Sequence, residues 1–343
     1  MALRREKVGR SILIVLAAWL ATASAARPAR ALPEGRDALP PDIATLYDAG
    51  HYRRAAEALE AAVKRNPQVA SLHYWLGRCL FEIRDFTRSI SSLEDATELA
   101  SGLSAYHDWL GRACGRKADE SSHSNMVSAL SLARRTHHEF EIAVRLDATN
   151  IQARRDLIAF MASAPASLGG GEGNALGQIR ALSAVDPVEG ALALADLYAV
   201  EKKFQQANEE YQKTLKSAPS RISVYLEAAD YYRDRGDSEH TEQAVEAAAK
   251  LAPSDRRLSY YRGVVLILEN KDSTAAENDL RTYLNTVPDN SEIPSHSSAY
   301  EWLGKLYENE DKPDLAAEQY NAALALDPQD KTLREALKRV QKK

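Results

Sequence analysis

The sequence has few of the features that several common classes of protein require. It contains 2 cysteines in 343 residues, too few for a disulfide scaffold or a four-cysteine zinc site. Its 16 glycines and 13 prolines exclude a low-complexity linker protein. Lysine and arginine (44) do not outnumber aspartate and glutamate (49), so the chain lacks the basic excess typical of nucleic-acid binders. What is present, 45% apolar and 27% charged residues, favours an α-helical globular protein.

The chain also lacks an apolar run long enough to span a membrane. The uncharged run at 11–26 has 16 residues, and a spanning helix needs roughly 20. Four basic residues precede this run, and Ala23-Ser24-Ala25 has the A-x-A form that signal peptidase accepts. The pattern predicts a cleaved signal peptide at 1–25 and a periplasmic or secreted protein without a membrane span. The alternative is an uncleaved N-terminus that anchors the chain to the membrane.

Two markers recur after this leader. Trp-Leu-Gly occurs three times, beginning at Trp75, Trp109 and Trp302, and the first two copies are 34 residues apart. A proline closes most units, and the closing residues are Pro67, Pro187, Pro219, Pro253, Pro288 and Pro328. A recurring unit of this length predicts stacked helical hairpins, because one hairpin cannot bury its apolar face alone.

The unit resembles the tetratricopeptide repeat (TPR), with its pattern of W-x2-L-G-x2-Y, then A-x3-F, A and P. The last unit fits best, through Leu303, Gly304, Tyr307, Ala316, Tyr320, Ala323 and Pro328. The resemblance implies an all-α, right-handed α-solenoid of about eight stacked helix-turn-helix repeats with a C-terminal capping helix.

On this interpretation the chain has four parts. A linker at 26–40 follows the signal peptide, the TPR array occupies 41–330, and a capping helix occupies 331–343 with Leu333, Leu337 and Val340 facing inward. The approximate repeats are 36–69, 70–103, 104–150, 151–187, 188–221, 222–255, 256–290 and 297–330.

Three places interrupt the regular spacing. The excess residues lie near 116–128 in the third repeat, at 164–174 in the fourth, and at 289–296, an extended connector before the eighth. Insertions in repeat proteins often map to loops on the binding face. Tolerated surface variation is the alternative, since long surface loops cost little stability.

No residue pattern predicts catalysis or a cofactor. The glycines at 169–171 lack the strand and the Gly-Lys-Ser/Thr of a phosphate-binding loop, so we expect a turn. His73 and His107 are 34 residues apart, which places them in neighbouring repeats, about 9–10 Å apart and too far for one zinc ion. Cys79 and Cys114 also fall on the first helices of neighbouring repeats. The sequence leaves two alternatives for them, a disulfide or two buried thiols.

The resemblance also implies a binding face. In the proteins that this chain resembles, the first helices line a concave groove that holds a peptide or a partner's helix. The corresponding residues here are Tyr74, Arg78, Phe81, Asp108, Arg112, Arg155 and Tyr260. Arg78, Arg112 and Arg155 would then share one surface and suit a partner with an acidic or aromatic segment. The competing interpretation is that Asp108 and nearby glutamates already neutralise them.

The expected function is therefore a non-enzymatic protein-protein interaction scaffold that works outside the cytoplasm. Partners would be proteins, and neither nucleic acid nor a metal or cofactor is expected. One alternative is a dedicated accessory subunit of an envelope complex for secretion, cell-wall synthesis or outer-membrane assembly. Another is an enzyme that uses the inserted loops of repeats three and four.

Overall fold

The computed structural model describes residues 39–122, 124–217 and 220–342, and within these ranges it is entirely helical. It has 17 α-helices, a short 3-10 helix (Ala166–Leu168) and no strand among the described residues, so the predicted all-α class is confirmed. The predicted signal peptide lies outside the described residues. The helices are α1 Pro41–Asp48, α2 Tyr52–Arg65, α3 Ala70–Glu82, α4 Phe86–Leu99, α5 Ser104–Ser121, α6 Met126–Leu146, α7 Ile151–Ser163, α8 Glu172–Val185, α9 Pro187–Val200, α10 Phe204–Lys216, α11 Ile222–Asp234, α12 Ser238–Leu251, α13 Leu258–Leu268, α14 Ser273–Thr286, α15 His296–Asn309, α16 Pro313–Leu326 and α17 Lys331–Val340.

Consecutive helices form antiparallel hairpins, and each hairpin packs on the next. The eight pairs run from α1 with α2 to α15 with α16, and α17 lies against α16 at the end of the stack. This arrangement confirms the predicted α-solenoid with a capping helix. In α17, Leu333 and Val340 are buried as expected, and Leu337 is partly buried. The basic residues Lys338 and Arg339 lie in its last turn, where the helix dipole favours positive charge.

Most of the hairpins turn in the same way. A residue with left-handed backbone conformation separates the two helices in six pairs: Gly50, Arg84, Lys202, Gly236, Asn270 and Asp311. Side-chain caps then start several of the second helices; Asp85, for example, accepts a hydrogen bond from the Arg88 amide. This shared turn explains why the repeat keeps its length near 34 residues despite variable sequence.

The two histidines at equivalent repeat positions are structural. The His73 ring contacts the Pro67 carbonyl oxygen (2.9 Å) and the Asp95 carboxylate (3.2 Å). The His107 ring repeats this arrangement with the Ser101 carbonyl oxygen (3.1 Å) and Glu139 (2.7 Å). Each buried ring therefore ties the incoming loop to the second helix of its own hairpin.

The excess residues of the third repeat do not form a loop. Helices α5 and α6 are longer than the other hairpin helices, with 18 and 21 residues, and a short turn joins them. The expected loop near 116–128 is therefore mainly two additional helical segments. The insertion at 164–174 forms a loop that contains the 3-10 helix Ala166–Leu168 and ends at the start of α8. Gly170 is required in this loop because a Cβ atom there would lie 1.8 Å from the Ala164 carbonyl oxygen.

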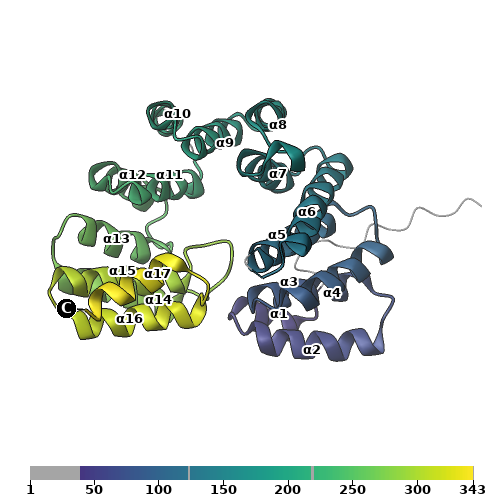
Figure 1. The fold of residues 1–343 in the computed structure, drawn as a ribbon, viewed down its shortest axis with the longest axis horizontal. Helices are drawn as coiled ribbons and strands as arrows, with labels where there is room; N and C mark the ends of the chain where they lie inside the picture. Colours follow the sequence, from purple (N-terminus) through teal and green to yellow (C-terminus); the bar gives the residue numbers. More distant parts are fainter. Residues whose placement is uncertain (1–38, 123, 218–219, 343) are drawn as a thin grey trace, which may run out of the picture.

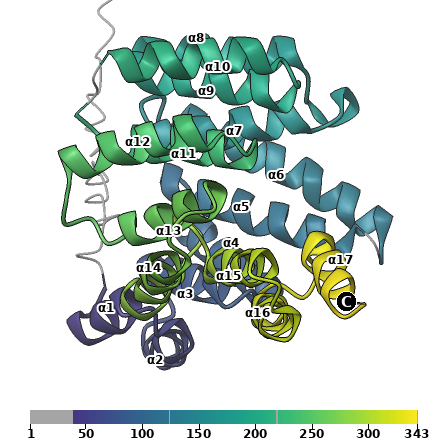
Figure 2. The ribbon, with the colours of Figure 1, turned by 90° about the vertical axis from the view of Figure 1, so that its left-hand side faces the viewer.

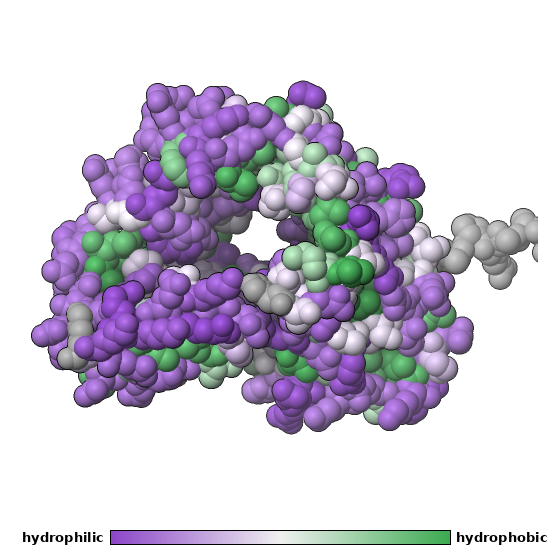
Figure 3. Space-filling model, viewed as in Figure 1, coloured by the Kyte–Doolittle hydropathy of each residue, from purple (hydrophilic) through white to green (hydrophobic). Residues whose placement is uncertain are grey.

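The hairpins wind into a nearly closed ring (Figure 1). The N-terminal arm, which we define as α1 to α6, and the C-terminal arm, α13 to α17, face each other across a narrow seam, and α7 to α12 complete the circle. Seen from the side, α8, α9 and α10 lie at one end of the molecule and α2 and α16 at the other (Figure 2). The space-filling view keeps a central opening, with a mostly hydrophilic outer rim (Figure 3).

Candidate functional site: the inner face of the ring

The segment at 287–295, which we call the connector, joins α14 to α15 and crosses the seam. The Ser291 backbone N–H and hydroxyl both donate to the Glu82 carboxylate, at 2.9 and 2.8 Å. Gly50 in the first hairpin lies against Pro288, so close that a Cβ atom there would lie 2.8 Å from the proline Cβ. The connector therefore lies on the inner face of the N-terminal arm as a non-helical loop with a turn at Ser291 and Glu292.

Outside the connector, the described residues show one ion pair between the two arms. Arg84 in the α3–α4 turn pairs with Asp327 after α16 at 3.1 Å, and this pair is partly exposed. Such exposed pairs contribute about 0–1 kcal/mol. The seam is thus small, polar and centred on the connector.

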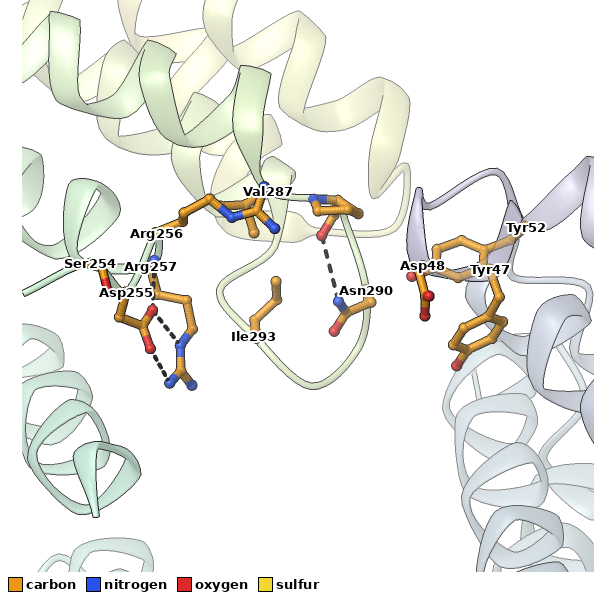
Figure 4. Close-up of a pocket in the computed structure, with 11 residues that line it drawn as sticks. Tyr47, Asp48, Tyr52, Ser254, Asp255, Arg256, Arg257, Val287, Asn290 and Ile293 are labelled. Atoms are coloured by element: carbon orange, nitrogen blue, oxygen red, sulfur yellow. Dashed lines mark hydrogen bonds and ion pairs between the residues drawn. The ribbon is translucent and has the colours of Figure 1, made fainter. Parts of the chain in front are cut away.

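Residues of the connector line three clefts in the described part of the chain. The largest, about 970 Å³, lies between the connector and the inner side of α3 to α7, where Phe81, Arg112 and Phe160 contribute. A second, about 610 Å³, lies at the seam between Tyr47 and Tyr52 on one arm and Arg256 and Arg257 on the other (Figure 4). A third, about 450 Å³, is lined by Glu227, Asp230, Arg233 and Tyr260 on the C-terminal side.

Arg78 lies in an aromatic cage beneath the connector. Its guanidinium carbon is 4.2 Å from the ring centre of Trp109, 4.6 Å from Trp75 and 5.3 Å from Tyr47. Only 14% of the side chain is exposed, and its Nε has no hydrogen-bond partner. The nearest carboxylate in an ion pair is Glu292 of the connector, at 3.7 Å, which is too long for a hydrogen bond. Aromatic faces attract this cation but cannot accept its N–H groups as a carboxylate does.

Arg112 lies next to this cage but has its own carboxylates. Its Nε donates to Asp156 at 2.6 Å and lies 3.3 Å from Asp108, and its guanidinium is 4.8 Å from the Trp109 ring. Glu292 is 3.9 Å from its Nη1. Burial, together with the charge of nearby Asp156, raises the pKa of Asp108 to about 8. Asp108 therefore retains its proton more readily than an ordinary aspartate, and Arg112 pairs with both Asp108 and Asp156.

We expect replacement of Asp108 by Asn to remove a pH-dependent loss of stability. An unfolded aspartate titrates near pH ~3.9, so the folded protein binds the extra proton and becomes less stable as pH rises from there through about 8. Above pH 8 the variant should exceed the wild type by about 1–3 kcal/mol, the cost of a buried polar group without a partner. Urea unfolding followed by circular dichroism from pH 5 to 9 measures this.

The exposed Asp119 supplies the matched control. Asp119→Asn should follow the wild-type pH profile, because its side chain is exposed to water. An Asp108→Asn profile parallel to the wild type would contradict the raised pKa of Asp108.

Arg155 forms ion pairs with carboxylates of α9 and α11. It forms a bidentate pair with Glu227 of α11 (2.8 and 2.5 Å) and contacts Glu189 (2.9 Å) and Asp196 (3.1 Å) of α9. The Tyr211 hydroxyl donates to the other oxygen of Asp196. One guanidinium thus joins the first helices of three successive repeats.

The predicted groove residues divide into two groups. Arg78 and Arg112 lie together on the inner face near Glu292, and Phe81 and Arg112 line the largest cleft. Tyr74, Asp108 and Tyr260 are not open groove residues, since 4%, 3% and 0% of their surfaces are exposed. Neighbouring repeats cover them: Tyr74 stacks on Tyr106 at 4.5 Å, and the Tyr260 hydroxyl bonds Ser298 at 2.7 Å.

Arg155 is neutralised by its three carboxylates and is 22% exposed, so the expectation that the three arginines share one open surface stays a prediction. The competing interpretation, neutralisation by local acids, applies to Arg155 and largely to Arg112. Only Arg78 keeps a charge without a close carboxylate among the pairs described above.

Sequence reasoning missed Tyr47, Trp109, Glu82 and Glu292. Trp109 was visible as part of the Trp-Leu-Gly marker, and Glu292 lies in the connector that the irregular spacing singled out. Nothing local indicated that the connector would meet the N-terminal arm, because Ser291 and Glu82 are 209 positions apart.

Other chemistry is not favoured in the described part of the chain. No group of three or more His, Cys, Asp or Glu side chains there could hold a metal ion. Cys79 and Cys114 are both buried free thiols, and burial raises the pKa of each to about 12. Such thiols are poor nucleophiles. None of the described helices is both long and apolar enough to cross a membrane.

Comparisons with known proteins agree with this architecture. The family model described as "Tetratricopeptide repeat" matches residues 45–104, 226–291 and 268–331, so these segments are similar to tetratricopeptide repeats. No curated protein matches the chain.

Several solved structures are similar at low sequence identity. Yeast Tom70 superimposes with a TM-score of 0.56 at 14% identity, over 84% of this chain and 58% of its own. A tetratricopeptide repeat protein from Parabacteroides merdae gives a TM-score of 0.48 at 16% identity, over 83% and 99%. A TPR protein of Thermus thermophilus gives 0.45 at 19% identity, over 55% and 94%. The similarity to Tom70 supports the α-solenoid fold and nothing beyond the fold.

Proposed function

We propose that this chain is a non-enzymatic scaffold outside the cytoplasm that binds extended segments of partner proteins on the inner face of the ring. The observation that supports this most directly is the connector. It is a non-helical segment that lies on the inner face and bonds to it through a backbone N–H as well as a side chain. The same surface can therefore accept a backbone N–H from a non-helical segment of another chain.

The fold and the clefts support the same proposal. Solenoids of this kind expose long concave surfaces, and proteins with such repeats generally act as scaffolds for protein interactions. The largest cleft combines the aromatic rings of Phe81, Phe86 and Phe160 with charged groups such as Arg116 and Asp156. Aromatic anchors with a polar surround are typical of protein-binding sites.

A single blocking substitution tests the proposal. Ala159 is exposed on α7 and lines the largest cleft, so Ala159→Arg fills the cleft without altering the helix. Ala61 is exposed on α2 and lines none of the three clefts, which makes Ala61→Arg the matched control. Tagged wild type, Ala61→Arg and Ala159→Arg are each used to capture proteins from envelope extract, with mass spectrometry as the readout.

We expect wild type and Ala61→Arg to capture the same proteins and Ala159→Arg to lose them. Identical captured sets from all three chains would refute binding on the inner face. The same spectra report the N-terminus of the recovered protein: export predicts a start near Ala26, and an intact Met1 would contradict a cleaved leader.

A further inference from the structure

Glu292 occupies the entrance of the Arg78 cage without satisfying it. The carboxylate is 3.7 Å from Arg78 and 3.9 Å from Arg112, and 57% of the Glu292 side chain is exposed. A carboxylate that fits an arginine in full makes two bonds of about 2.7–2.9 Å. The cage thus holds a desolvated cation whose present carboxylate is distant and solvated.

The rest of the connector is held by groups that are easily released. Burial raises the pKa of the Glu82 carboxyl group, and the two hydrogen bonds from Ser291 act in the opposite direction. Glu82 is therefore a half-buried acceptor, and any non-helical segment offers it a donor in a free backbone N–H. Glu82 and Arg78 lie on adjacent turns of α3. Glu82 can accept a hydrogen bond from a backbone N–H, and Arg78 can pair with an acidic side chain.

We propose that Glu82 and the Arg78 cage form a recognition site for an acidic residue in an extended protein segment, and that Ser291 and Glu292 occupy it as an intramolecular ligand that the partner displaces. This inference rests on the proposed scaffold function and names the chemistry of its partner. Displacement of the connector also loosens the seam, because it removes the Gly50–Pro288 contact and leaves the exposed Arg84–Asp327 pair as the one ion pair between the arms among the described residues.

The geometry explains why the internal ligand can be displaced. The connector is tethered at both ends, by α14 and α15, so it stays near the site at high effective concentration. Its carboxylate nevertheless lies beyond hydrogen-bond distance of both arginines. An untethered segment has no such restraint and can approach Arg78 closely.

The test uses the connector sequence itself as the probe. A fluorescent peptide with the sequence of residues 287–296 is titrated into the wild-type chain and into the variant Ser291→Ala with Glu292→Gln, which we call the opened chain. Binding is read by anisotropy at low salt. We expect the opened chain to bind at least about tenfold more tightly, since the competing internal ligand is weakened.

A second peptide, with Gln in place of Glu292, isolates the charge without any change to the protein. It should bind the opened chain about tenfold more weakly than the acidic peptide. Adding Arg78→Gln to the opened chain should make the two peptides equivalent, and Arg53→Gln on the exposed side of α2 is its control.

Ring opening is measured independently of the peptides. Spin labels are placed through Glu57→Cys on α2 and Glu318→Cys on α16, both exposed positions, while Cys79 and Cys114 are 0% exposed and do not label. The distance distribution should broaden in the opened chain and on addition of the acidic peptide to the wild type.

Equal affinity of the two peptides for the opened chain, or no binding of either, would overturn acidic recognition. Equal affinity of wild type and opened chain, or an unchanged distance distribution, would overturn the intramolecular ligand. The comparison of Ala159→Arg with Ala61→Arg is read separately. If that comparison still separates the captured proteins, the scaffold function stands and only this inference fails.

Discussion

Replacing Arg155 by Leu should destabilise the protein by about 3 kcal/mol at neutral pH. The substitution removes the cation shared by Glu189, Asp196 and Glu227, and breaking a buried ion pair by deleting one partner costs about 3–5 kcal/mol. The lower end of this range applies because Asp196 is 41% exposed and partly solvated. The three carboxylates come from α9 and α11, so the loss falls on the middle of the ring.

The size of this loss should depend on pH. Burial already raises the pKa of Glu227 above its ordinary value, although Arg155 acts to lower it. Without Arg155 the folded-state pKa rises further, so folding of the variant takes up protons and its stability falls as pH rises. The difference from wild type should therefore be larger at pH 7.5 than at pH 5. Urea midpoints at the two pH values measure it.

Arg88 supplies the control for this experiment. It also pairs with a glutamate on a neighbouring helix, Glu60, but 54% of its side chain is exposed. Arg88→Leu should cost about 0–1 kcal/mol and show little dependence on pH. An Arg155→Leu variant that behaves like Arg88→Leu would mean that water already screens the network.

The hairpins were predictable from the sequence because their cause is local. Trp75, Leu76 and Gly77 recur 34 residues later as Trp109, Leu110 and Gly111, and each set lies on the first helix of its hairpin. The length of α5 and α6 was not predictable in the same way. Extra residues in a repeat can lengthen its helices or its loop, and periodicity does not distinguish the two outcomes.

The inner face was predictable only in part, because it depends on the sum of many small rotations. The repeat positions placed Arg78 and Arg112 correctly on one surface. They did not reveal that Tyr74 and Tyr260 are covered, or that the connector would reach Glu82. Each repeat adds its own rotation to the stack, and closure of the ring emerges only over all of them.

Packing within and between the repeats also determines the position of the residues on the inner face. A solenoid is held together by contacts between neighbouring repeats, so a local defect separates the two arms without unfolding every repeat. The seam contributes few contacts of its own. Packing inside the hairpins is therefore what keeps Glu82 and Arg78 in position to meet the connector.

The largest single loss is expected from the packing of Gly77 against Leu93. Leu93 on α4 is 0% exposed, and its Cγ would lie 2.5 Å from a Cβ atom added to Gly77 on α3. Leu93→Ala leaves a cavity and should cost about 2–5 kcal/mol. Gly77→Ala overfills the same space and should cost about 1–3 kcal/mol, even though alanine favours the helix.

The double variant Gly77→Ala with Leu93→Ala decides whether this pair is the reason for the Trp-Leu-Gly marker. The added methyl group then enters the space that Leu93 vacates, so the double variant should cost less than the sum of the single variants. Gly102→Ala is the control; it should change the free energy of unfolding by less than about 0.5 kcal/mol, since no heavy atom lies within 4 Å of its Cβ position. Strict additivity in urea unfolding would contradict the pairing. Loss of connector-peptide binding in Leu93→Ala alone, with recovery in the double variant, would link this packing directly to the inner face.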